Sequence, residues 1–541
     1  MTQPKDKGSR PLEFDYVVVG AGAAGCLLAA RLSQAAETTV CLIEAGPSDR
    51  HLFIAIPAGF TKMVVNPRYI WDFATEPAEG TAERPIRLLQ GRTLGGSTSI
   101  NGMIFTRGQP QDFDGWRDAG NPGWGFEDVL PHFKRIESRG GADPQFRGEG
   151  GGVKLTEAHS ENPAIAAFMA AAQAAGLPFN ADYNGASQEG VAVTQQAIAG
   201  GRRMSSSAAF LRPARQHRNL EVLVESTVRR VLFEGRRDCG VELDTRGSAL
   251  REIRARREVI LCCGSLNTPR LLQVSGVADA HLLRELGVPL VHHLPGVGEN
   301  LQDHYLARVV LRGRNFTSFN EQARGLRLVG EVGRYLAGRP SLLALCPSPV
   351  HFFTHSGLEP GPPDLQGLFV PANYKGATRD LDDRPGMTCA VWQHRPLSRG
   401  HVRAVSPDIA VAPRIQPNYL AHPHDQQVLV RGLRFCRELL SAPLLQPYVD
   451  HELLPGPGTR SDAEWLQHAR ATGSTVYHPV GTARMGPAAD AMSVVDAQLR
   501  VHGVQNLRVV DASVMPTIPS GNTGAATMMI ADKAADLMLR P

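Results

Sequence analysis

Residues 14–25 read Phe-Asp-Tyr-Val-Val-Val-Gly-Ala-Gly-Ala-Ala-Gly, and this stretch decides how the first part of the chain folds. The β-branched run that ends at Val19 predicts a short buried strand, and the alanine-rich segment after it has the periodicity of a helix. Gly20 permits the tight turn between them, Gly22 leaves room for a pyrophosphate, and Gly25 lets helix and strand pack closely. The spacing G-x-G-x-x-G is typical of a dinucleotide-binding site.

A second β-rich run, residues 39–43, ends at Glu44. A carboxylate at this distance from the glycines can accept hydrogen bonds from a ribose diol and repels a 2′-phosphate. Close packing alone would explain the glycines but not the acid. The pattern does not separate NAD from FAD. The residues that we expect around the dinucleotide here are Gly20, Gly22, Ala23, Ala24, Gly25, Glu44 and Ala45.

Composition limits the class of protein. The 541 residues are 42% hydrophobic and 20% charged, which fits a globular enzyme with two to four domains. The formal net charge of +4 is too small to attract a polyanion, so we expect no nucleic-acid partner. The eight cysteines form no C-x-x-C pair and predict reduced core residues. We see no metal-binding pattern.

One apolar run, residues 16–30, has to be considered as a targeting or membrane segment. It is shorter than the 18 or so residues that span a bilayer, glycines interrupt it, and Glu13 and Asp15 stand just before or at its start. We therefore expect no transmembrane segment and a protein that is cytoplasmic or at most peripheral to a membrane. Residues 1–11 are expected to be a disordered leader.

A second glycine cluster, residues 91–102, reads Gly-Arg-Thr-Leu-Gly-Gly-Ser-Thr-Ser-Ile-Asn-Gly. A flexible surface loop is the simple interpretation. Its apolar members, Leu94 and Ile100, instead favour a buried segment whose small residues let backbone approach a flat ligand. This segment resembles the first signature of the glucose-methanol-choline (GMC) oxidoreductases, a family of flavoenzymes.

The resemblance extends along nearly the whole chain. Residues 264–277 are similar to the second signature of the family, although Ala278 stands where its last glycine is expected. Residues 294–304 resemble the segment that connects the two domains. The catalytic and flavin-closing segments resemble residues 477–486 and 509–524. Together with residues 91–102, these motifs occur in the family's order and identify a member of its choline and alcohol dehydrogenase branch.

The resemblance implies an α/β fold with two interleaved domains. A Rossmann-like FAD-binding domain would comprise residues 12–155, 200–312 and 470–541. A substrate-binding domain of the α+β type would comprise residues 156–199 and 313–469, built on an antiparallel sheet.

Within the second domain, the sequence itself predicts a few elements. Alternating residues in 401–405 and 409–415 predict strands of that antiparallel sheet, and residues 425–440 predict a helix.

The resemblance also implies FAD as the cofactor. Covalently flavinylated members carry a histidine directly before the asparagine of the first signature, whereas this chain has Ile100, so we expect noncovalent FAD. The second glycine cluster should lie along the flavin, and the C-terminal motif along the ribityl and phosphate part. The further cofactor residues that we expect are Arg92, Gly95, Gly96, Ser97, Asn101, Gly102, Met103, Ile104, Val228, Asp511, Ala512, Asn522 and Thr523.

His478 and Asn522 are the expected catalytic residues. Neutral imidazole, with an ordinary pKa near 6.5, can accept a hydroxyl proton without extreme tuning. His478 precedes Pro479 in a constrained loop, and the resemblance makes it the base. An amide cannot be a base, so Asn522 would position the oxygen. Asn522 also fits the cap of a helix that begins near Ala525, and both roles can hold together.

The expected reaction is oxidation of a primary alcohol, aliphatic or aromatic, to the aldehyde by hydride transfer to flavin N5. Oxygen or a quinone- or cytochrome-type carrier could reoxidise the flavin. Residues 343–353 lack the acid that a quaternary ammonium substrate would favour, which argues against choline. Choline dehydrogenase-like activity and cyanohydrin lyase chemistry without net oxidation are the alternatives. The substrate-pocket candidates are Tyr477, His351, Phe352, Phe353 and Trp392.

Overall fold

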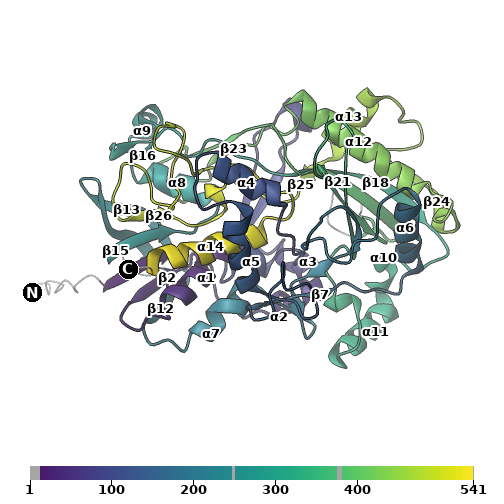
Figure 1. The fold of residues 1–541 in the computed structure, drawn as a ribbon, viewed down its shortest axis with the longest axis horizontal. Helices are drawn as coiled ribbons and strands as arrows, with labels where there is room; N and C mark the ends of the chain where they lie inside the picture. The colour runs from purple at the N-terminus through teal and green to yellow at the C-terminus, as the bar shows by residue number, and fades with distance from the viewer. Residues whose placement is uncertain (1–11, 246–249, 375–380, 540–541) are drawn as a thin grey trace, which may run out of the picture.

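The chain folds around two sheets that lie side by side. The computed structural model describes residues 12–245, 250–374 and 381–539, so the predicted leader at residues 1–11 lies outside the described residues. One sheet occupies the left half of Figure 1, and the other, around β18 and β21, occupies the right half.

The first sheet has the predicted parallel core. Strands β1, β2, β12, β15 and β26 run parallel to one another, while β14 pairs antiparallel with β13 and with the N-terminal part of β15. The strand order is β12-β2-β1-β15-β14-β13, with β26 beside β15. The strands span Leu12–Val19 (β1), Val40–Ile43 (β2), Leu220–Leu223 (β12), Ser226–Glu234 (β13), Arg237–Thr245 (β14), Arg251–Leu261 (β15) and Leu507–Val509 (β26).

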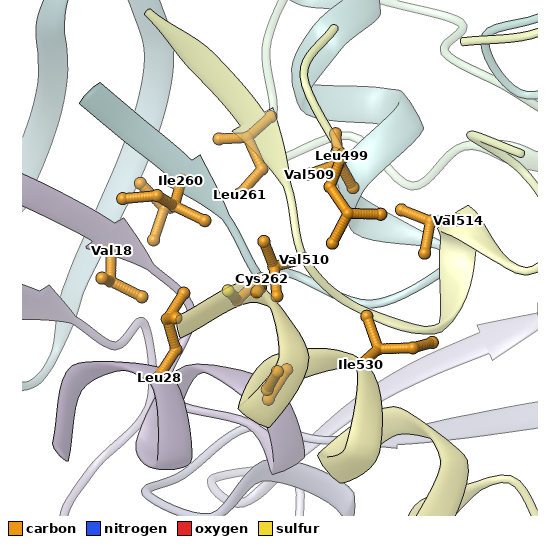
Figure 2. Close-up of a cluster of buried hydrophobic side chains, with 14 of the residues drawn as sticks. Val18, Leu28, Ile260, Leu261, Cys262, Leu499, Val509, Val510, Val514 and Ile530 are labelled. Atoms are coloured by element: carbon orange, nitrogen blue, oxygen red, sulfur yellow. The ribbon is translucent and has the colours of Figure 1, made fainter. Parts of the chain in front are cut away.

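Helices α1 and α14 cover one face of this sheet (Figure 1). Both are rich in alanine, which lets the two helices and the strands approach closely. Leu28 of α1 and Ile530 of α14 meet Ile260 and Val509 of the strands in one buried cluster (Figure 2). The helices of eight or more residues are Ala23–Leu32 (α1), Pro110–Asp118 (α4), Phe126–Ile136 (α5), Pro163–Ala174 (α6), Asn267–Val274 (α8), Gly325–Leu336 (α11), Pro423–Leu440 (α12), Asp462–Thr472 (α13) and Gly524–Leu539 (α14).

The second sheet is antiparallel throughout. Its order is β24-β18-β21-β20-β19-β8, with β25 beside β18. One face packs on α6, α12 and α13 around a second apolar core, and the other face turns toward the catalytic candidates. The strands span Gly190–Val193 (β8), Tyr305–Gly313 (β18), Val350–Thr354 (β19), Leu365–Val370 (β20), Gly386–Gln393 (β21), Val449–Leu454 (β24) and Ser474–Thr475 (β25).

Two expectations need correction. The segments at 401–405 and 409–415 do not join the large antiparallel sheet. Strands β22 (His401–Arg403) and β23 (Arg414–Gln416) form a separate two-stranded sheet, because β22 packs on α8 of the other half. Residues 305–312 belong to β18 and hence to the second sheet. The division into two interleaved domains stays a proposal, with this boundary moved to the start of β18. The predicted helix at 425–440 is confirmed as α12.

None of the helices in the described ranges combines the length and the apolar character that crossing a membrane requires.

Candidate functional site

A cleft opens at the carboxyl ends of β1 and β2, where the predicted dinucleotide loop lies. Gly20, Gly22, Glu44, Ala45, Gly96 and Val228 line it, so six of the predicted cofactor residues share one cavity. Sequence reasoning missed the other lining residues. These are Val19, Ile43, Trp71, Gly91, Ser226, Thr227, Cys262, Cys263, Asn267, Arg270, Leu271 and Ile409.

The two glycine clusters lie against each other. The Gly95 amide donates to the Ala21 carbonyl at 2.8 Å, and a Cβ on Gly96 would come within 2.7 Å of the Gly22 Cα. Gly25 serves packing, since its Cβ would lie 1.9 Å from the Gly20 carbonyl oxygen. Close backbone approach, which only glycine permits, therefore builds the wall of the cleft.

The hydrogen-bonding groups of the cleft suit a dinucleotide. Helix α1 begins at Ala23, and no side chain caps it. Its first backbone amides can therefore donate hydrogen bonds to an anion such as a phosphate. Glu44 accepts from the amides of Ala21 (3.0 Å) and Gly46 (2.8 Å) and keeps further lone pairs for a diol. Burial raises the pKa of Glu44 to about 7.

Some buried polar atoms in or beside this cleft have no hydrogen-bond partner among the described residues. The Asn267 Oδ1 atom lines the cleft and, within the described ranges, has no hydrogen-bond partner. The Arg92 Nε atom also has no partner among the described residues, and its guanidinium lies 4.7 Å from the ring centroid of Trp71, which lines the cleft. Such atoms are costly to bury unpaired, which is consistent with a bound polar ligand.

The first-signature segment turns from the cleft toward the second sheet. Arg203 holds Asn101 by bonds to its backbone oxygen (2.7 Å) and its Oδ1 (2.8 Å), and Met103 takes a left-handed φ of 61°. The Ser97 hydroxyl accepts from the Gly91 amide at 3.0 Å and so serves the loop itself. Gly102 packs beside Pro347, where a Cβ would come within 2.8 Å.

The C-terminal motif closes the same region. Asp511 accepts from the Gly264 amide (2.8 Å) and the Thr268 hydroxyl (2.6 Å), which ties the second signature to the C-terminal segment. Ala512 accepts from the Gly481 amide at 3.2 Å. Helix α14 begins at Gly524, directly after Asn522 and Thr523, as predicted.

His478 and Asn522 are in contact. The Asn522 Nδ2 atom lies 3.1 Å from His478 Nε2. The Oδ1 atom of Asn522 accepts from the Thr106 hydroxyl at 3.1 Å and from the side-chain amide of Gln366 at 3.4 Å. The two donors at Oδ1 fix which end of the Asn522 side-chain amide faces His478. The nitrogen faces His478 and must donate to it. This bond requires His478 Nε2 to carry a lone pair rather than a proton.

A second histidine fixes the same tautomer from the other side. His304 Nε2 lies 2.7 Å from the backbone carbonyl of His394 and must donate to it. Burial lowers the pKa of His304 to about 4, so the ring is neutral and its Nδ1 accepts. His478 Nδ1, 2.9 Å away, is therefore the donor, and its proton cannot be on Nε2. Sequence reasoning missed His304, although it lies inside the motif at residues 294–304.

The electrostatics keep His478 uncharged. Burial and the neighbouring His304 ring hold its pKa well below the ordinary 6.5. The carboxyl of Asp303 accepts from the backbone amide of His478 at 2.8 Å and from the hydroxyls of Tyr419 and Thr475, each at 2.5 Å. Burial raises the pKa of Asp303 to about 6, so above that pH the group is a carboxylate that anchors the loop through these three hydrogen bonds.

The substrate-pocket candidates fall on different sides of the second sheet. Gln366 of β20 contacts Asn522 and therefore faces the site. Phe353 and Trp392 lie directly opposite Gln366 on the two neighbouring strands, so their side chains point to the same face. His351 shares that face and bonds Thr194 at 2.7 Å. Side chains alternate along a strand, which turns Phe352 the other way.

The structure therefore corrects the expectation that Phe352 lines the substrate pocket: this side chain packs in the core on the far face, beside Phe168. Tyr477 packs against the cluster that contains Ile100. Gln366 was missed, and nothing in its local sequence marks it.

Comparisons with known proteins agree with this geometry. A family model described as GMC oxidoreductase matches residues 14–306, and a second of the same description matches residues 396–531. The chain is 38% identical to the alcohol dehydrogenase [acceptor] of Pseudomonas putida over 97% of this chain and 96% of that one. It is 37% identical to human mitochondrial choline dehydrogenase, over 97% and 90% of the two chains.

A solved structure is similar as well. That of pyridoxine 4-oxidase from Mesorbium loti matches with a TM-score of 0.88 and 32% identity, covering 97% of this chain and 98% of that one. The chain belongs to the GMC oxidoreductases, FAD-dependent enzymes that act on CH–OH donors.

Proposed function

We propose that this enzyme oxidises a neutral primary alcohol to the aldehyde, with His478 as the base and Asn522 positioning the alcohol oxygen. Bound FAD supplies an acceptor for the hydride at its N5 atom. The observation that carries the proposal is the chain of hydrogen bonds from the His394 carbonyl through His304 to His478 and Asn522.

The chain of bonds prepares His478 for proton transfer. Its Nδ1–H is committed to His304, and its Nε2 lone pair faces the Asn522 amide. An alcohol hydroxyl that enters between them can donate to Nε2 and accept from Nδ2 of Asn522, so one residue takes the proton and the other holds the oxygen. Both roles come from groups that the fold has already oriented.

The choice of a neutral substrate rests on the surroundings of Asn522. Phe353, Gln366 and Trp392 occupy the adjoining sheet face, and none of them is acidic. A quaternary ammonium ion is favoured by a nearby carboxylate as well as by aromatic rings. The relatives named for alcohol and for choline are about equally similar to this chain, so their names do not decide the substrate.

Turnover with a panel of alcohols tests the substrate class. Aliphatic and aromatic primary alcohols should reduce an artificial dye acceptor in the presence of the enzyme with a higher kcat/KM than choline does. A clear preference for choline would refute the neutral-substrate proposal. Peroxide formation in air, measured beside dye reduction, separates oxygen from a carrier as the acceptor. Cyanide release from cyanohydrins without flavin reduction would instead support lyase chemistry.

FAD should be bound without a covalent link. Ile100 occupies the position of a flavin-linking histidine and has no nucleophilic atom. Precipitating the yellow holoenzyme with acid should therefore release all FAD into the supernatant and leave a colourless pellet. Yellow colour that stays with the denatured polypeptide would contradict this expectation.

The pH dependence follows from the lowered pKa of His478. Only the neutral ring can accept a proton, and a lowered pKa keeps the ring neutral below pH 6.5. The rate of flavin reduction should therefore stay flat from pH 8 to 6.5 and fall at lower pH, where Asp303, whose pKa is about 6, and then His478 take up protons. A rapid-mixing pH profile measures this. A rate that halves near pH 6.5 would contradict it.

His304 should act as a positioning residue. Phenylalanine there keeps a ring but removes the acceptor for His478 Nδ1–H, and leaving that buried donor unpaired should slow flavin reduction about five- to a hundredfold. Glutamine can both donate to the His394 carbonyl and accept from Nδ1–H, so His304→Gln should recover most of the flavin reduction rate. Equal losses in both variants would indicate that the histidine serves packing only.

A further inference from the structure

Helix α11 presents an unusual apolar face to solvent. None of its twelve residues is buried, and Leu326, Val329 and Leu336 are 89%, 66% and 78% exposed. Their spacing of three and seven residues places them on one face of the helix. The opposite side of the helix contacts the rest of the protein, and there the Tyr335 hydroxyl donates to the Gly201 carbonyl at 3.0 Å.

The apolar face continues onto neighbouring elements. The β10–β11 hairpin (Ile198–Arg203) joins α11, through Gly201, to helix α2 (Leu52–Ala55), which β11 contacts. Leu52 and Phe53 of α2 are 68% and 40% exposed. Both helices lie along the lower edge of the molecule (Figure 1).

The exposed charged side chains of the two segments themselves are basic. This holds for the exposed side chains between residues 49 and 68 and between residues 325 and 339. At the border of the surface, Glu225, Glu321 and Asp383 each pair with one arginine, so the excess of positive charge is partial. Arg327 and Arg334 flank the apolar stripe of α11. A ring of basic groups beside exposed leucines matches the way an amphipathic helix lies in the surface of an anionic bilayer. The basic residues concerned are Arg50, Lys62, Arg68, Arg327, Arg334 and Arg339.

A second copy of the chain fits this surface less well. A helix of twelve residues is about 18 Å long, and one of its faces offers far less than the roughly 800 Å² per partner of a stable interface. Two identical basic surfaces would also repel each other. A bilayer needs no matching shape and supplies the opposite charge.

We infer that α11 and α2 form a docking surface for an anionic phospholipid bilayer, on which the enzyme lies peripherally. Along the chain, α11 leads to Cys346, which packs on Met103 of the first-signature segment. The inference is independent of the substrate and of the role of His478, because it rests on exposure and charge alone.

Vesicle flotation of the holoenzyme tests the inference. The protein should float with vesicles that contain about a third phosphatidylglycerol and bind vesicles of pure phosphatidylcholine more weakly. The double variant Leu326→Glu with Leu336→Glu should lose at least about tenfold in partitioning, since transfer of even one leucine from water is worth that much. Its FAD absorbance and thermal midpoint should not change, because neither leucine is buried.

Two controls keep the result interpretable. Leu290 is 56% exposed and precedes β17 (His292–His293), which pairs with β16 (Val277–Ala278) at the opposite corner of the molecule, so Leu290→Glu should float like the parent. Sedimentation velocity measures association of the free protein. Wild type that stays unbound with anionic vesicles would overturn the inference. So would a dimer that the double variant dissociates while vesicle binding is unaffected.

Discussion

Replacing His478 by alanine should slow the anaerobic reduction of bound FAD by an alcohol by about two to four orders of magnitude, the usual contribution of a general base. The hydrogen bonds of His478 leave its Nε2 atom as the acceptor that faces Asn522. Asn522 cannot replace it, because an amide nitrogen has no basic lone pair. Rapid mixing with absorbance at the flavin band measures the rate.

A second buried histidine provides the matched control. His468 of α13 bonds the Arg308 carbonyl at 2.9 Å and does not contact Asn522 or His478 within the described ranges. His468→Ala should therefore keep the reduction rate within a few-fold of the parent. If His478→Ala keeps its FAD and reduces it at nearly the parental rate, His478 is not the base.

Replacing Gly22 by valine should strongly weaken FAD binding while the protein still folds. Gly22 has φ of −80°, which any residue adopts, and the nearest atom to a Cβ there is the Cys262 carbonyl oxygen at an ordinary 3.9 Å. The new side chain would point into the cleft beside the first amides of α1 and exclude a phosphate from them. Losing two charge-assisted hydrogen bonds would weaken FAD binding about 10²- to 10⁴-fold.

The measurement is the FAD content of the purified variant, with circular dichroism as the test of folding. Gly25→Val is the informative comparison, because its Cβ would lie 1.9 Å from the Gly20 carbonyl oxygen and should disrupt the packing of α1 on the sheet. A Gly22→Val protein that retains stoichiometric FAD would show that the pyrophosphate does not lie at this turn.

The elements nearest the glycine motif were predictable because local rules dominate there. Strand β1, helix α1 and strand β2 follow from β-branched runs, small residues and glycine punctuation, and their pairing places Glu44 at the edge of the cleft. The start of α14 after Asn522 was predictable for the same reason. The contact between His478 and Asn522, 44 residues apart, was anticipated only through the family resemblance.

The rest depends on long-range pairing. Phe352 and Phe353 look alike in sequence, and only the register of β19 decides that Phe353 faces the site while Phe352 enters the core. Gln366 reaches Asn522 through the same register. His304 could have been found from its motif, but its function depends on a carbonyl 90 residues away, which no local pattern predicts.

The central claim is that a neutral His478 accepts the alcohol proton while FAD takes up the hydride. Its most direct test is the absorbance spectrum of the holoenzyme after an alcohol from the primary-alcohol panel is added without oxygen. We predict that the flavin band bleaches in the wild type at pH 6.5 as fast as at pH 8, and that His478→Ala bleaches at least about a hundredfold more slowly. A wild-type flavin that no primary alcohol bleaches, or a His478→Ala flavin that bleaches equally fast, would contradict the account.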